Sequence, residues 1–154
     1  MVVEHVLTVC AGNICRSPAA QYLLRQQRPD LHITSAGLTA LSGHPISPSV
    51  AQLLAQRGID TGDHRAQPVT EVQVRQAQLI LVAELRHKQH IERLYPFARG
   101  KVFRICEAQH TDVPDPHRQA LAVHQHSLAL TEQGVNAWVR HLSTLGARAA
   151  TANP

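Results

Sequence analysis

CAGNICRSP, residues 10–18, is the stretch around which the rest of the chain is organised. A short apolar run, residues 6–9, leads into it, and a helical pattern begins at Ala19. A loop between a strand and a helix start carries unpaired backbone N–H groups and the positive end of the helix dipole, which together favour an anion. Arg16 adds a planar fork of donors suited to two phosphate oxygens. The stretch therefore predicts an oxyanion-binding loop.

The first residue of this stretch, Cys10, is the candidate nucleophile. The positive field of the loop would stabilise its thiolate at neutral pH, and Arg16 follows at the C-x5-R spacing. Gly12 and Asn13 both tolerate the left-handed backbone that a loop wrapped around an ion requires. Ser17 can cap the following helix, donate to the Cys10 thiolate, or do both. A lone cysteine is more often a core thiol, but the full pattern is typical of a cysteine-based phosphatase.

The composition narrows the class of protein. At 154 residues the chain is long enough for one domain with its own core. The formal charge of +4 suits an anionic substrate, but dispersed basic residues and 3% aromatics argue against nucleic-acid binding. Three cysteines argue against a disulfide-built secreted fold. No signal-peptide or membrane-spanning pattern is found, so we expect a cytoplasmic protein without membrane insertion.

Short apolar runs alternate with helical patterns along the chain. Strands are expected at residues 6–9, 32–36, 79–83 and 101–105. Helices are expected from residue 19 to a stop at 28–30, from 50 to a stop at 58, and at 70–76 and 86–94. This alternation predicts an α/β fold, a single three-layer domain in which helices flank a four-stranded parallel sheet. The phosphate-binding loop would follow the first strand, at the edge where such sheets bind ligands.

The C-terminal part of the chain predicts one long closing helix. Apolar residues recur every seven positions from Leu121 to Leu142, and we expect an interruption near Gly134. The predicted domain covers residues 1–147, and residues 148–154 are expected to form a short flexible tail.

Phosphoryl transfer to sulfur needs an acid that protonates the leaving oxygen. Asp112 and Asp115 lie in DVPDP, residues 112–116, which follows the fourth predicted strand and so reaches the same sheet edge as Cys10. Asp-Pro by itself is usually only a turn signal. Asp115, with proline on both sides, is the predicted proton donor, and Asp112 is expected to be a turn or helper residue.

Eleven histidines raise the question of a metal site. His87 and His90 are one helical turn apart, but no carboxylate or cysteine completes a metal-binding motif. His124 and His126 fall on different faces of a helix. We therefore expect solvated histidines, no metal and no cofactor, and a core thiol at Cys106.

The cysteine loop, the DVPDP segment and the order of the elements together resemble the low-molecular-weight protein-tyrosine phosphatases over nearly the whole chain. Four further segments are similar to those of the bacterial members, namely SAG at 35–37, DHRA at 63–66, LILVAE at 79–84 and ARGKV at 98–102. The nearest resemblance is to the branch paired with tyrosine autokinases of capsule and exopolysaccharide export. It implies a phosphotyrosine-protein substrate, such an autokinase being one candidate, and we expect a monomer.

The resemblance implies a role for each loop residue. Cys10 would form a phosphocysteine, Arg16 would hold the transferring phosphoryl group, and Asp115 would protonate the tyrosyl oxygen and then activate water. Asn13 would hold the shape of the loop by hydrogen bonds. The remaining members of the phosphate-binding loop are Ala11, Gly12, Ile14, Cys15 and Ser17, of which Ser17 would assist the thiolate. The resemblance also implies that Cys15 forms a reversible disulfide with the nucleophile under oxidation.

The expected slot for the substrate ring departs from the family pattern. His117 stands where the family usually has tyrosine after Asp-Pro, and Leu41 stands where some relatives have an aromatic residue. Ala83 replaces a methionine of many bacterial members. An aliphatic wall opposite an imidazole is therefore expected to change ring affinity without changing the phosphate chemistry.

Two alternatives stay open at this point. An arsenate reductase of the same fold shares the C-x5-R loop, but its disulfide relay needs two further cysteines, and residues 79–97 contain none. A phosphocysteine carrier or phosphate-sensing module would hold a long-lived phosphothiol, and should lack Arg16 and the acid. The presence of both favours turnover.

Overall fold

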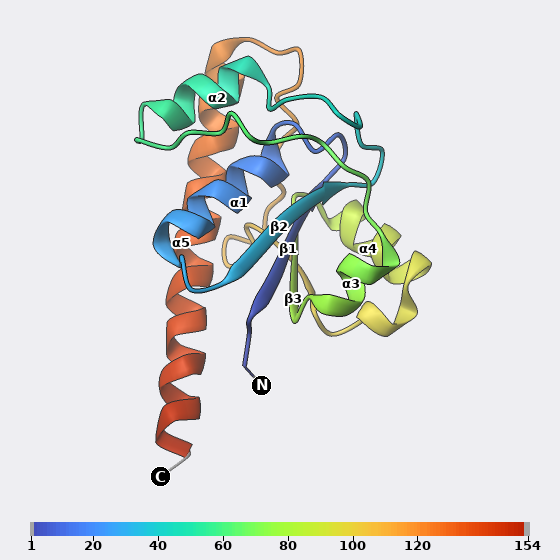
Figure 1. The fold of residues 1–154 in the computed structure, drawn as a ribbon, viewed down its shortest axis with the longest axis vertical. Helices are drawn as coiled ribbons and strands as arrows, with labels where there is room; N and C mark the ends of the chain where they lie inside the picture. Colours follow the sequence, from blue (N-terminus) through green and yellow to red (C-terminus); the bar gives the residue numbers. More distant parts are fainter. Residues whose placement is uncertain (1, 153–154) are drawn as a thin grey trace.

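A four-stranded parallel sheet forms the centre of the molecule (Figure 1). The computed structural model of the protein describes residues 2–152, and side chains as far as residue 145. The strands are β1 (His5–Cys10), β2 (His32–Gly37), β3 (Leu79–Val82) and β4 (Val102–Arg104), in the spatial order β2-β1-β3-β4. Every pairing is parallel. The predicted α/β fold with a four-stranded parallel sheet is thus confirmed.

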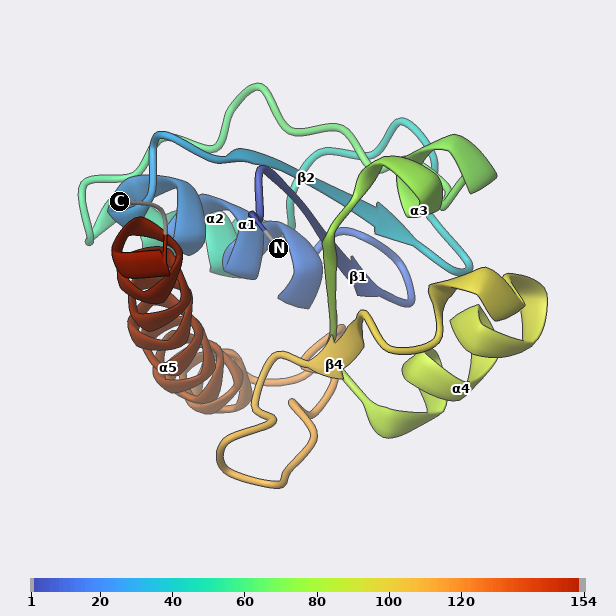
Figure 2. The ribbon, with the colours of Figure 1, turned by 90° about the horizontal axis from the view of Figure 1, so that it is seen from below.

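Helices cover both faces of this sheet (Figure 2). One face carries α1 (Arg16–Gln27), α2 (Pro48–Ala55) and α5 (Leu121–Ala152), and the other carries α3 (Glu71–Gln76), α4 (Leu85–Leu94) and the short 3-10 helix Pro96–Ala98. Leu79 and Leu81 of β3 belong to the first core, whereas Ile80 and Val82 belong to the second. Because successive residues of β3 alternate between two buried faces, this strand reads as a continuous apolar run.

Helix α5 runs without a break through Gly134, so the predicted interruption is wrong. A Cβ atom at Gly134 would lie 2.4 Å from the carbonyl oxygen of Ile105, just after β4. The glycine therefore permits a close helix-to-strand approach. The helix also continues through residues 148–152 of the predicted tail, while residues 153–154 lie outside the described residues. Within residues 2–152, no helix is long and apolar enough to cross a membrane.

The loops that follow the parallel strands meet at one edge of the sheet, where the candidate site lies. The backbone N–H of Leu38 donates to the oxygen of Cys10 (3.0 Å), which ties the loop after β2 to the end of β1. The N–H of Val113 donates to the oxygen of Ala83 (2.9 Å), which ties the segment after β4 to the end of β3. Residues from all four connections are thereby brought together.

Candidate active site

A cavity of about 200 Å³ opens above Cys10, the last residue of β1. It is lined by Cys10, Ala11, Gly12, Ile14, Cys15, Arg16, Thr39, Leu41, Asp115 and His117. Apart from Asn13 and Ser17, which lie behind the lining, the structure gathers all of the predicted loop, acid and slot residues here. A larger cavity of about 610 Å³ lies between α5 and the opposite edge of the sheet, where Gln78 and Gly100 line it, away from this chemistry.

Asn13 holds the shape of the loop through both polar atoms of its side chain. Its φ angle is 59°, which confirms the left-handed conformation predicted for it, whereas Gly12 does not adopt a positive φ. The Asn13 amide donates to the Oγ atoms of Ser17 (2.8 Å) and Ser35 (3.0 Å). Its Oδ1 accepts from the backbone N–H of Gln67 (3.0 Å). A loop fixed by this many bonds keeps its peptide groups aimed at the cavity.

His64 completes the support of this loop from behind. Its Nε2 lies 2.7 Å from the carbonyl oxygen of Asn13, which can only accept, so the ring must carry its proton on Nε2. Burial, more than any neighbour, holds the pKa of His64 below its ordinary value. A neutral His64 therefore serves as a fixed donor that fastens the left-handed residue.

Ser17 lies beside the cysteine and does not cap the helix. Helix α1 begins at Arg16 and its cap residue is Cys15, so the predicted capping role of Ser17 is wrong. The Ser17 Oγ lies 2.9 Å from the Cys10 sulfur. Because the Asn13 amide already donates to this oxygen, the Ser17 hydroxyl is free to direct its own proton at the sulfur. A thiolate at Cys10 thus has a hydroxyl donor in place.

Arg16 is buried, with 2% of its side chain exposed, yet within the described part of the chain only one nitrogen of its guanidinium donates hydrogen bonds. Both hydrogens of one terminal nitrogen are used, because this nitrogen donates to Oε2 of Glu84 (2.5 Å) and to the carbonyl oxygen of Val113 (2.8 Å). The other terminal nitrogen lies 3.8 Å from Oδ2 of Asp115. The edge made by Nε and this second nitrogen is left for a planar, two-oxygen contact in the cavity.

Glu84 anchors Arg16, and sequence reasoning did not single it out as a site residue. It follows β3, and its Oε1 also accepts from Nε of Arg86 (2.9 Å). Burial by itself would raise the pKa of Glu84, but the hydrogen bonds from Arg86 and Arg16 outweigh it and the pKa is lowered. The carboxylate therefore stays charged at neutral pH and orients the arginine. The only sequence signal was an acidic residue directly after a buried strand.

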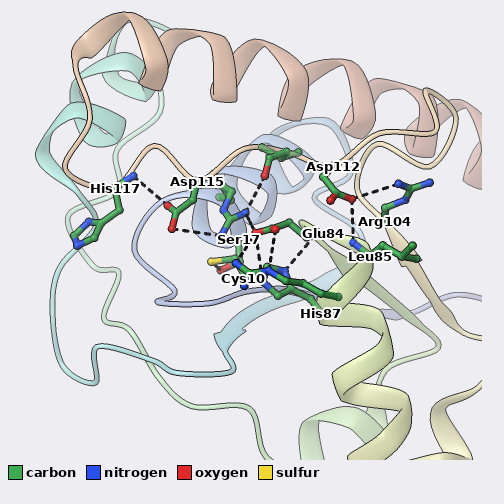
Figure 3. Close-up of polar contacts among 12 residues, drawn as sticks. Cys10, Ser17, Glu84, Leu85, His87, Arg104, Asp112, Asp115 and His117 are labelled. Carbon is green, nitrogen blue, oxygen red and sulfur yellow. Dashed lines mark hydrogen bonds and ion pairs between the residues drawn. The ribbon is translucent and has the colours of Figure 1, made fainter.

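The two aspartates of the DVPDP segment occupy different environments (Figure 3). Asp115 is half exposed and lies on the cavity wall, where its Oδ1 accepts from the backbone N–H of His117 (3.0 Å). Asp112 lies outside the cavity, and its Oδ1 accepts from the N–H of Leu85 (3.0 Å) and from Arg104 (3.3 Å). Asp112 thus braces the loop to α4 and β4, as expected of a turn or helper residue.

The other two cysteines are both buried, but in different places. Cys15 lines the cavity, and burial raises its pKa to about 12, while its hydrogen bond with Ser47 opposes that shift only in part. Cys106 is the predicted core thiol, because it is fully buried and its sulfur donates to the carbonyl oxygen of Leu130 (3.0 Å). Burial raises the pKa of Cys106 to about 11. Both therefore remain neutral thiols at neutral pH.

Two of the histidines expected to be solvated are buried. His87 on α4 and His124 in the first turn of α5 are only 3% and 4% exposed, so that expectation is wrong for them, whereas His90 and His126 are exposed. Among the described residues, no group of three or more histidine, cysteine or acidic side chains is arranged to hold a metal ion.

The parallel sheet, the anion-binding loop and the cysteine at its base define the class, which is that of the cysteine-dependent phosphatases. The chain belongs to the low molecular weight phosphotyrosine protein phosphatase family, whose model matches residues 5–148. It is 44% identical to the probable low molecular weight protein-tyrosine-phosphatase EpsP of Ralstonia nicotianae, over 94% of this chain and 100% of the relative.

Solved structures give the same result. The tyrosine phosphatase Wzb from Escherichia coli K30, in complex with sulphate, superimposes with a TM-score of 0.88 at 34% identity, over 92% of this chain and 99% of that one. The YwlE arginine phosphatase from Geobacillus stearothermophilus matches with a TM-score of 0.88 at 27% identity, over 94% of this chain and 96% of that one. The protein is thus a hydrolase of the low-molecular-weight protein-tyrosine phosphatase family, related to EpsP and Wzb and acting on phosphotyrosine proteins.

Proposed function

We propose that this phosphatase transfers the phosphoryl group of phosphotyrosine to Cys10 and then to water. In the first step the Cys10 thiolate attacks phosphorus, the S–P bond forms, the bond from phosphorus to the tyrosyl oxygen breaks, and Asp115 gives that oxygen its proton. In the second step water attacks phosphorus, Asp115 takes a proton from the water, and the S–P bond breaks to restore the thiolate. Phosphate then leaves, and no metal or cofactor takes part.

The free edge of Arg16 is the observation that carries this proposal. Glu84 and Val113 hold one terminal nitrogen, so the Nε edge already faces the cavity before any substrate arrives and can contact two phosphoryl oxygens. Val113 lies two residues before Asp115, so the group that would hold phosphate also holds the loop that carries the acid. The sulphate in the related Wzb structure supports oxyanion binding in this fold.

We assign the ring of phosphotyrosine to the slot between Leu41 and His117, which line the cavity from two different loops. An aliphatic side chain and an imidazole give less stacking than two aromatic rings, so we expect weaker binding of the ring itself. The relatives named EpsP and Wzb favour a tyrosine autokinase of an exopolysaccharide pathway as the physiological substrate. The cytoplasmic location and the monomeric state stay predictions.

Hydrolysis of three phosphopeptides tests the proposal, with phosphotyrosine, phosphoserine and phosphoarginine in the same peptide. We expect turnover of the phosphotyrosine peptide, inhibition by vanadate, and no turnover by Cys10→Ser. Faster turnover of the phosphoarginine peptide than of the phosphotyrosine peptide would indicate an arginine phosphatase like YwlE. Substantial hydrolysis by Cys10→Ser would overturn the route through a phosphocysteine. Phosphate captured once per protein, without steady release, would indicate the carrier.

The reductase alternative gains no support from the structure. Cys106 is the cysteine outside the loop, and its sulfur is bonded into the core beside α5. A disulfide relay would need a second accessible cysteine near the cavity. Reduction of arsenate with thioredoxin as the electron source is the assay that would revive it.

A further inference from the structure

His87 is a buried polar residue near the site that the steps above do not use (Figure 3). Its Nδ1 lies 3.2 Å from the backbone nitrogen of Glu84, which can only donate. Nδ1 is therefore the acceptor, and the ring proton sits on Nε2. Burial is the main reason that the pKa of His87 is lowered to about 4, so the ring is neutral at working pH.

Among the residues that the structure describes, the buried Nε2 donor of His87 has no hydrogen-bond partner. It lies 3.6 Å from Oε2 of Glu84, slightly beyond hydrogen-bond distance. The same oxygen accepts the 2.5 Å bond from Arg16. A neutral donor thus stands directly beside the atom that anchors the phosphate-binding arginine. Buried polar groups that lack a partner are uncommon, and this one points at the site.

We propose that His87 is a positioning residue that acts through Glu84. One ring nitrogen holds the Glu84 backbone, and the other is a reserve donor for the Glu84 carboxylate. When a phosphate dianion in the cavity draws the Arg16 guanidinium toward itself, the Arg16–Glu84 bond lengthens. Nε2–H then closes onto Oε2 and keeps the carboxylate aimed at Arg16.

Two substitutions at this position distinguish the role of the Nδ1 acceptor from that of the Nε2 donor. His87→Asn can keep an acceptor near Nδ1 but has no donor at Nε2, whereas His87→Gln can place an amide N–H near Nε2. The exposed His90, one turn further along α4, supplies the matched control His90→Asn. For each variant we would measure the dissociation constant for vanadate, the separate changes in kcat and in KM, and the thermal midpoint.

We expect His87→Asn to weaken vanadate binding about tenfold, because it loses one hydrogen bond to a charged group. His87→Gln should recover most of that affinity, and His90→Asn should match the wild type. If His87→Asn binds vanadate as tightly as the wild type, the proposal is overturned. A loss of thermal midpoint that is equal in both His87 variants, with no change in affinity, would show a structural role only.

Coupling to Glu84 provides the second test. In a Glu84→Gln background, His87→Asn should cause no further loss of vanadate affinity, because the carboxylate through which it acts is gone. Additive losses would contradict the proposal. Because this role rests on the proposed function, the wild type is measured first. Absence of vanadate binding by the wild type would refute the proposed function, whereas normal binding with an unaffected His87→Asn would refute the role of His87 alone.

Discussion

Gly37, the last residue of β2, offers a test of how tightly the phosphate-binding loop is packed. A Cβ atom at this position would lie 2.4 Å from the carbonyl oxygen of Ala11 and 3.1 Å from the Cβ of Asn13. Carbon and oxygen in contact stand about 3.4 Å apart, so Gly37→Ala must push the loop away by about 1 Å. Neither contact is the end of a flexible side chain, and the backbone of the loop has to move.

The magnitudes follow from this displacement. Overpacking of this kind costs about 1–3 kcal/mol of unfolding free energy. At a few degrees per kcal/mol for a chain of this size, the thermal midpoint should fall by about 3–10 °C. A misplacement of about 1 Å at the phosphate site can lower kcat/KM by about 100-fold. The loss of activity should thus exceed what the loss of folded protein explains.

Calorimetry and steady-state hydrolysis of an aryl phosphate, both below the midpoint of the variant, measure these effects. Gly12→Ala is the matched control for stability, because a Cβ there meets only side-chain atoms of Ile14 and Leu41 at 3.8 Å. Its midpoint should stay within about 2 °C of the wild type. The reasoning is refuted if Gly37→Ala keeps the wild-type midpoint and the wild-type affinity for phosphate.

Three further predictions concern single side chains. In steady-state assays, Asp115→Asn should lower kcat for phosphotyrosine about 100-fold or more. The loss for p-nitrophenyl phosphate should be much smaller, because its leaving group needs little protonation. Equal losses for both substrates would show that another residue is the acid. Peroxide should oxidise the Cys10 thiolate to a sulfenic acid, which the Cys15 thiol then attacks, releasing water and forming a disulfide that mass spectrometry detects. Recovery of Cys15→Ser as readily as the wild type would disprove this protective role. Between pH about 6.5 and 4 the unfolded chain binds a proton at His87 that the folded chain does not, so the free energy of unfolding should fall as the pH falls. Urea titrations across this window should show a flatter pH profile for His87→Gln, and an unchanged profile would contradict a neutral buried His87.

The strands and the cysteine loop could be predicted because their signals are local. A strand buried on both faces leaves a short, unbroken apolar run, and residues 79–83 gave the clearest one, in which the structure places β3 at Leu79–Val82. The spacing of Cys10 and Arg16 defines an anion loop wherever a helix follows it. Parallel strands then place the later loops at the same edge, which is how Asp115 could be assigned to the cavity wall.

Contacts between distant segments could not be predicted in the same way. Glu84 lies 68 residues from Arg16, and their contact depends on β1 and β3 being neighbours in the sheet. The local pattern around Gly134 is the same for a helix break and for a close approach, and only the position of Ile105 distinguishes them. His87 carries no sequence signal for burial, because its face of α4 is set by packing against the sheet edge.

Ser17 shows how a local signal can be overridden. A serine followed by proline is a good helix start. The helix nevertheless begins at Arg16, two residues earlier than a Ser17 cap would place it, and the Ser17 hydroxyl contacts Asn13 and Cys10 instead. The predicted contact with the sulfur and the predicted cap thus competed for one hydroxyl group, and the sulfur contact is the one found.

The central claim is that Cys10 alone is an ionised nucleophile inside an anion-binding loop. Selective alkylation of the three cysteines tests this claim most directly. Iodoacetamide at pH 6.5, followed by mass mapping, should modify Cys10 rapidly and leave Cys15 and Cys106 unmodified, since burial raises their pKa values to about 12 and about 11. Inorganic phosphate should protect Cys10. Alkylation of Cys10 that is no faster than that of the buried thiols, or that phosphate does not slow, would contradict the account.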